Sequence, residues 1–169
     1  MSDIDTPENP MLDENEFDID LGGIDTSIQI MEKDPKAELF IKSVKIKPNK
    51  DETGKNLIVF FSNNAPAMST LGVTIPRGEA LITKYFPLQP NPKKSEDPDY
   101  NPDGWKKSIA DLLDACFGSD KDNRPRLNAS TIEAMKDIVV LAKVEVEKPQ
   151  EGTDFGPKNI ASGLKYLSA

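Results

Sequence analysis

Apolar and polar residues alternate along the first regular segment of the chain, ELFIKSVKIK, and a period of two is typical of a β-strand. The alternation changes phase within the segment, because Leu39 and Ile41 share one phase and Val44 and Ile46 share the other. One extra residue in a strand turns every later side chain to the opposite face. We therefore expect a bulge or strong bend near Ser43, with the two apolar pairs facing opposite sides.

Two further strands are expected in the first half of the chain. Residues 49–54 have turn composition, and residues 56–61 form a dense β-branched and aromatic run, so the first two strands are predicted to form a hairpin. A third extended region covers residues 71–86 and is interrupted at 76–78. Its strongest part is the segment 80–86.

A proline-rich loop and a helix follow the third strand. Residues 87–104 contain five prolines, so neither a helix nor a central strand can persist there. Residues 105–117 then place apolar groups at a helical spacing, and Gly118 supplies a stop signal. A short second helix, capped by Asn128 or Ser130, is expected after a polar loop.

Two more strands are expected over residues 138–147 and 159–167, with a turn at 151–157 between them. The resulting order is three strands, a helix and two strands. This is the order of the OB-fold, a five-stranded Greek-key barrel. The sequence therefore predicts a mainly β chain, folded as an OB-type barrel with a helix between its third and fourth strands.

Charge divides the chain into two parts. Residues 1–34 contain eleven acids and one lysine and carry a net charge of −10, whereas the rest of the chain carries +2 within a total of −8. A segment dense in like charge and poor in aromatic residues cannot bury enough apolar surface to fold alone. We expect residues 1–35 to form a disordered acidic leader and residues 36–169 to form one domain.

The leader contains apolar residues at Phe17, Ile19, Leu21 and Ile24, each set among acids. This pattern is typical of peptides that dock into a partner or onto their own domain. The alternative is a solvated tail whose few apolar residues cover the core or make no specific contact.

Catalysis is not expected. The chain has no histidine, which is the commonest general base and the commonest metal ligand. Its single cysteine, Cys116, lies in the apolar pattern of the predicted helix, and we expect it to be buried. Neither a phosphate-binding loop nor a zinc cluster can be formed from these residues. The sequence predicts a protein without enzymatic activity, cofactor or metal.

A metal-dependent nuclease is the one catalytic alternative that we considered. Asp137, Glu145 and Glu147 could hold magnesium, with Lys143 or Lys148 beside the attacked phosphate. Charges at alternate positions of a strand that faces water explain the same residues without chemistry, and we prefer that interpretation.

The expected location is cytoplasmic. No stretch of the sequence approaches the roughly 18 apolar residues that span a bilayer, and the N-terminus carries acids where a signal peptide carries bases. We therefore expect no membrane partner. The sequence leaves self-association open.

A surface that binds single-stranded DNA needs cations for phosphates and aromatic rings for unstacked bases. Both kinds of residue occur together in the predicted hairpin, the third strand and the second loop. The candidates are Lys42, Lys45, Lys47, Lys50, Lys55, Phe60, Phe61, Arg77, Lys84, Tyr85, Phe86, Arg124 and Arg126.

Each candidate also has an ordinary structural explanation. Adjacent residues of a strand face opposite sides, so one residue of the Phe60–Phe61 pair and one of the Tyr85–Phe86 pair are expected in the core. A lysine on a nearly neutral domain is most often simply solvated. Trp105, at the start of the predicted helix, is expected to pack against the core.

The chain resembles phage-encoded OB-fold proteins of replication and recombination modules, on the segments ELFIKSVKIK, DETGKNLIVFF, GWKKSIADLLDACFG, IVVLAKVEVE and DFGPKNIASGLKYL. The resemblance covers about residues 36–167. It implies sequence-nonspecific binding of single-stranded DNA, with replication or recombination proteins as further partners through the acidic leader. Many such proteins carry their acidic segment at the C-terminus, whereas this chain has it at the N-terminus. The alternative is a phage structural or adaptor protein whose leader orders on a neighbouring subunit.

Overall fold

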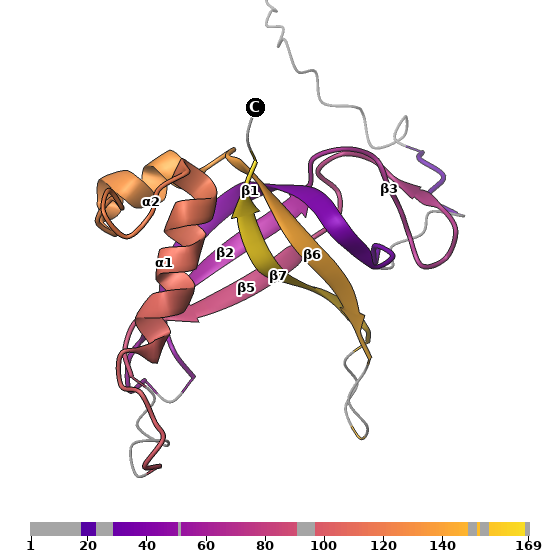
Figure 1. The fold of residues 1–169 in the computed structure, drawn as a ribbon. Helices are drawn as coiled ribbons and strands as arrows, with labels where there is room; N and C mark the ends of the chain where they lie inside the picture. The colour runs from indigo at the N-terminus through magenta and orange to yellow at the C-terminus, as the bar shows by residue number, and fades with distance from the viewer. Residues whose placement is uncertain are drawn as a thin grey trace, which may run out of the picture.

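The computed structural model describes residues 18–22, 29–50, 52–90, 97–148, 152 and 156–167. Figure 1 shows a twisted sheet with two helices packed on one side and a small ribbon at the opposite end of the molecule. The prediction of a mainly β chain is confirmed.

One antiparallel sheet of five strands forms the centre of the fold, in the order β5-β2-β1-β6-β7. Its strands are β1 (Asp34–Pro48), β2 (Lys55–Asn63), β5 (Ile82–Pro87), β6 (Val139–Glu147) and β7 (Lys158–Tyr166). The sheet is not closed into a barrel, because β5 and β7 are its two edges and do not pair with each other.

The smaller elements lie in the connections of this sheet. A two-stranded ribbon, β3 (Ala67–Met68) and β4 (Thr74–Ile75), separates β2 from β5. Two helices, α1 (Gly104–Phe117) and α2 (Ala129–Met135), separate β5 from β6. The side chain of Asn128 accepts a hydrogen bond from the backbone N–H of Thr131, so the predicted Asn128 cap of the short helix is confirmed.

The bulge predicted in the first strand is present, between Ile41 and Ser43. The prediction that the apolar residues before and after the bulge face opposite sides is wrong. Ile41 lies opposite Phe61 and Val44 lies opposite Val59, and both partners are fully buried on the same face of β2. The extra residue absorbs the phase change of the sequence, so the apolar side chains before and after the bulge point into one core.

The core lies between the inner face of the sheet and α1. The largest fully buried side chains are Phe61, Phe86, Leu39, Ile41, Leu57, Ile75, Ile82, Leu112, Met135, Val59, Val140 and Val144. Gly118 ends α1 in the left-handed conformation, with φ 64°, and its N–H donates to the carbonyl oxygen of Asp114. The predicted helix and its glycine stop are thus confirmed.

Packed structure begins before residue 36, the predicted start of the domain. Met31 is buried, and its backbone N–H and carbonyl both bond the side chain of Asn159, at 2.8 and 2.9 Å. β1 itself starts at Asp34. In the leader, Ile19 and Leu21 are exposed, whereas the other two apolar residues of the predicted docking peptide lie outside the described residues.

Within the described ranges, neither helix has the length and apolar character needed to cross a membrane.

Candidate nucleic-acid interface

The outer face of β1, β2 and β5 brings together side chains that the sequence places far apart. The register sets three cross-strand rows on this face, away from the core. They are Ser43–Phe60–Thr83, Lys45–Ile58–Tyr85 and Lys47–Asn56–Pro87. We call these residues the outer hairpin face.

The middle of the outer hairpin face combines a cation with two aromatic rings. The Lys45 ammonium nitrogen lies 5.6 Å from the centroid of the Phe60 ring. Tyr85 is 61% exposed, and its cross-strand neighbour Ile58 is buried. An exposed ring on the same face as a cation can stack with an unpaired base while the cation contacts a nearby phosphate.

The electrostatics of this face favour an anion. None of the residues on its three rows is Asp or Glu, although charged residues make up 30% of the chain. Lys45 and Lys47 form no ion pair within the part of the chain that the structure describes. Their charge is therefore not neutralised by a neighbouring carboxylate.

Two more predicted cations extend the face beyond the bulge. The guanidinium of Arg77 lies 4.4 Å from the centroid of the Phe40 ring, and its Nε donates to the backbone oxygen of Asn64. The ammonium group of Lys42 donates to the backbone oxygen of Gly78 at 3.0 Å. Both cations bond neutral groups, so both keep their full charge for a ligand.

The opposite end of the face is the turn between β1 and β2. Asn49 holds this turn, since its side-chain oxygen accepts a hydrogen bond from the backbone N–H of Thr53 at 2.9 Å. Lys47, Lys50 and Lys55 lie in or beside the turn, and all three are exposed. Lys47 belongs to the outer hairpin face, whereas Lys55 precedes the buried Leu57 by two residues and therefore has the inward phase of β2.

Three of the predicted contact residues are not available to a ligand on this face. Phe61 and Phe86 are 0% and 1% exposed, so no base can stack on either ring. Lys84 lies opposite the buried Val59 and therefore on the inner face. Burial lowers the pKa of Lys84, whose ammonium group donates to the carbonyl of Ala161.

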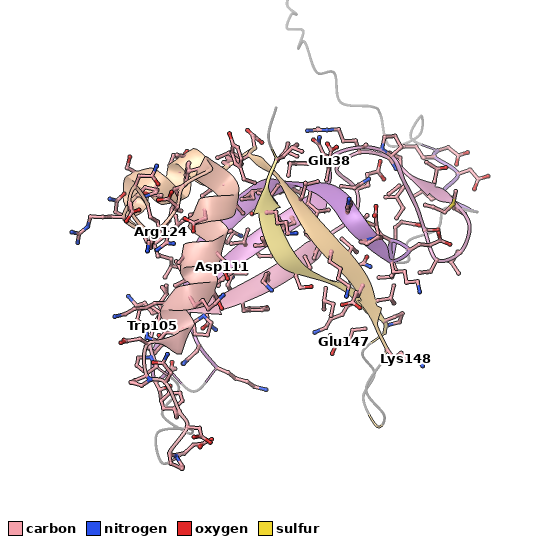
Figure 2. All side chains as sticks on the ribbon, in the orientation of Figure 1. Glu38, Trp105, Asp111, Arg124, Glu147 and Lys148 are labelled. Atoms are coloured by element: carbon pink, nitrogen blue, oxygen red, sulfur yellow. The ribbon has the colours of Figure 1, made fainter. Side chains whose placement is uncertain are left out.

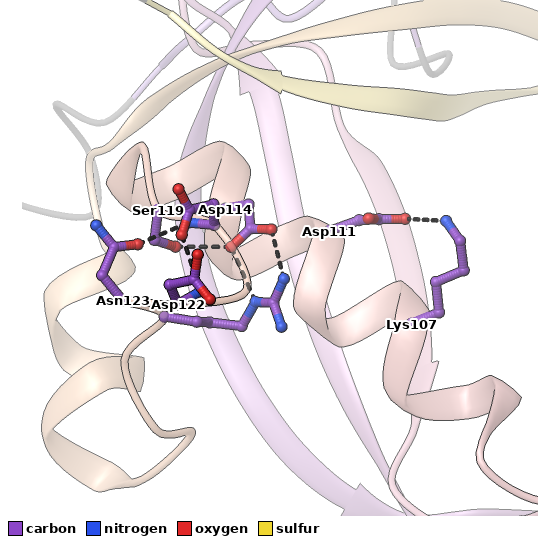
Figure 3. Close-up of polar contacts among 8 residues, drawn as sticks. Lys107, Asp111, Asp114, Ser119, Asp122 and Asn123 are labelled. Carbon is purple, nitrogen blue, oxygen red and sulfur yellow. Dashed lines mark hydrogen bonds and ion pairs between the residues drawn. The ribbon is translucent and has the colours of Figure 1, made fainter.

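Arg124 and Arg126 lie in the connection between α1 and α2, and Figure 1 shows this connection beside the two helices, away from the outer hairpin face. Arg124 donates two hydrogen bonds to Asp114, at 2.9 and 2.8 Å (Figure 3). These bonds hold the pKa of Asp114 below its usual range. Arg124 thus has a structural partner and lies apart from the predicted contact residues on the outer hairpin face.

Trp105 packs against the core, as predicted. Its indole nitrogen is buried and has no hydrogen-bond partner among the described residues.

The carboxylates of the nuclease alternative do not converge. Glu145 lies 3.7 Å from the ammonium group of Lys143, and Glu147 lies 3.5 Å from that of Lys158. Figure 2 shows Glu147 at the far end of β6 from α1. Within the described ranges, no group of three or more Cys, Asp or Glu side chains could hold a metal ion.

Sequence reasoning missed that Phe40 and Ile58 lie on the outer side of the sheet. Both are buried, and only the register of β1 against β2 places them on that side. Comparison of the chain with models of known protein families and with curated proteins finds no match.

Proposed function

We propose that the protein binds single-stranded DNA along the outer hairpin face, with little sequence preference and without catalysis. The observation that carries the proposal is that the exposed ring of Tyr85 lies on the same face as Lys45 and Phe60, in rows without carboxylates. Stacking tolerates any base, because every base has a π-face, and lysines contact the phosphates whatever the sequence.

We also infer an OB-type fold, which would support the same proposal. The strand order β5-β2-β1-β6-β7, with helices between β5 and β6, supports this inference. In it, β5, β6 and β7 would be the third, fourth and fifth strands of the OB-fold. The OB-fold is a partly open barrel that binds oligonucleotides on its second and third strands and in two adjoining loops. Those strands correspond to β2 and β5, which carry Phe60 and Tyr85.

The resemblance to phage replication and recombination proteins gives the proposal its biological setting. A protein that coats single strands keeps them unpaired for replication and recombination. The acidic leader would then serve to bring replication or recombination proteins to the coated strand.

A matched pair of double variants tests the proposal. Lys45→Gln with Lys47→Gln removes two cations from the outer hairpin face, and Lys106→Gln with Lys107→Gln removes two exposed cations from α1. Both variants have the same net charge. Affinity for a fluorescent oligothymidine is measured by anisotropy over a series of salt concentrations.

We expect the β1 pair to weaken binding and to reduce the slope of log affinity against log salt by about 1.4, since each phosphate contact on a single strand contributes roughly 0.7. The α1 pair should bind as the original chain does. Equal losses in both variants would show that net charge alone matters, and absence of binding at low salt would refute the proposal.

A further inference from the structure

The ribbon of β3 and β4, with the turn between them, projects from the end of the sheet opposite the helices (Figure 1). We call residues 67–75 the ribbon arm. No charged residue occurs between Lys55 and Arg77, in a chain of which 30% is charged. Surfaces that stay in water are normally rich in charge, and a lack of charge is typical of the centre of protein interfaces.

The ribbon arm also exposes large apolar side chains. Leu71 and Val73 are 74% and 57% exposed, and Met68 is 47% exposed. The turn that presents them is well formed, because the hydroxyl oxygen of Ser69 accepts hydrogen bonds from the backbone N–H groups of Leu71 and Val73. Three exposed apolar side chains on one ordered ribbon form a patch of the kind that binds another protein surface.

One edge of the ribbon arm is covered and the other is open. The segment before β1 covers β3, where Glu32 N–H donates to the Met68 carbonyl at 2.9 Å and Thr70 N–H donates to the Ile30 carbonyl at 2.8 Å. Within the described residues, β4 pairs with β3 alone. The outer edge of β4 is therefore free to accept another strand.

The register shows which backbone groups the open edge presents. Ser69 N–H donates to the Val73 carbonyl at 2.8 Å, so these two residues form a hydrogen-bonded pair. Bonded and non-bonded pairs alternate in an antiparallel ladder, and Met68 opposite Thr74 is then a non-bonded pair. The N–H and carbonyl of Thr74 consequently point away from β3, toward the open edge.

We propose that the open edge of β4 binds the β4 strand of a second copy of this chain, antiparallel about a two-fold axis at Thr74. Thr74 of each copy then exchanges both backbone hydrogen bonds with the other. Val73 of one copy then lies opposite Ile75 of its partner, which brings apolar side chains of the two arms next to each other. This inference goes beyond the proposed function and does not depend on it.

The absence of charge on the ribbon arm favours a second copy of the chain as its binding partner. In a two-fold interface every residue near the axis faces its own counterpart, so each charge there would meet a like charge. The ribbon arm carries no charge, so two copies of it can approach each other without repulsion between like charges. A charged partner of another kind would find no complementary charge on the arm.

Light scattering after size exclusion tests the proposal on the full chain. Interfaces below about 1,200 Å² are typical of weak association, so loading concentrations should range from roughly 10 µM to 1 mM. We expect the mass to rise with concentration to that of two chains. Leu71→Lys with Val73→Lys should keep the mass of one chain throughout, since it places unpaired charges at the arm.

Leu81→Lys is the matched control, because Leu81 is another exposed apolar residue, 53% exposed, outside the ribbon arm. It should associate as the original chain does. Circular dichroism confirms that each variant is folded. A single-chain mass for the original sequence at every concentration, or dimers that persist in the arm variant, would overturn the proposal, as would growth beyond two chains.

A cysteine substitution provides an independent measurement. Hydrogen-bonded antiparallel partners have Cα atoms about 5.5 Å apart, which is within the range for a disulfide. Under mild oxidation we expect Thr74→Cys to give a disulfide-linked dimer, and Ser108→Cys, on the exposed side of α1, to give none. Buried Cys116 should take no part. Equal cross-linking of the two variants would contradict the two-fold pairing at Thr74.

Discussion

The ammonium group of Lys84 on β5 donates a hydrogen bond to the carbonyl oxygen of Ala161 on β7, with a nitrogen–oxygen distance of 2.9 Å. The two strands are the edges of the sheet and do not pair through their backbones. Lys84 therefore supplies a polar link across the gap that backbone hydrogen bonds would close in a complete barrel.

Replacing Lys84 with Met should destabilise the protein by about 1 kcal/mol, because the variant keeps the apolar stem but leaves the Ala161 carbonyl without its donor. Urea unfolding followed by circular dichroism measures the change. Lys143→Met, at an exposed position on β6, is the control and should change stability little. Equal stability of Lys84→Met and the original chain would show that the link is not needed.

The stability of the original chain and that of Lys84→Met should depend differently on pH. Burial lowers the pKa of Lys84 in the folded state below 10.5, so the unfolded chain binds this proton more tightly. As pH rises from the lowered pKa toward 10.5, the cost of burying the charge disappears. The free energy of unfolding of the original chain should therefore rise relative to Lys84→Met in that window, and a fall would contradict the lowered pKa.

Gly118→Ala should destabilise the protein by roughly 1–2 kcal/mol, the cost of a left-handed conformation for a residue with a side chain. A Cβ at this position would also lie 2.9 Å from a carbon of the Tyr166 ring. Thermal unfolding measures the loss. Gly104→Ala, at the other end of α1, meets nothing within 4 Å and should be neutral or stabilising.

The thiol of Cys116 should be inert in the native protein. Burial raises its pKa to about 12, so almost no thiolate is present at pH 8, and the side chain is 4% exposed. An aromatic disulfide reagent should release one equivalent of chromophore only after urea is added. Ser108→Cys provides the positive control, since its exposed thiol should react at once without denaturant.

Much of the fold could be predicted because its signals are local. The Gly118 stop, the Asn128 cap and the position of the bulge each depend on residues within a few positions of one another. The effect of the bulge on the core could not be predicted in the same way. Whether Val44 faces the core is decided by Val59 on another strand, and no local pattern contains that pairing.

The same distinction between local patterns and contacts between distant strands applies to the candidate site. Strand alternation predicted that one ring of each aromatic pair is buried, and the structure identifies Phe61 and Phe86 as the buried members. The inward position of Lys84, opposite Val59, was not predicted, because a lysine in a strand usually faces water. Its inward position depends on an acceptor from β7, which is distant in the sequence.

Tyr85 gives the most direct test of stacking on the outer hairpin face. Its ring is 61% exposed, so removing it should leave the core intact, while a base that stacks on it would lose about 1–3 kcal/mol. We expect Tyr85→Ala to bind oligothymidine roughly 5 to 150 times more weakly and Tyr85→Phe, which keeps the ring, to bind almost normally.

Tyr166→Ala removes another exposed tyrosine, on β7, and is the matched control. Its affinity should stay near that of the original chain, provided that thermal unfolding shows it folded at the assay temperature. The salt dependence separates the two kinds of contact, because loss of a ring lowers affinity at every salt concentration without changing the slope. A Tyr85→Ala variant with unchanged affinity would place the bases elsewhere on the molecule.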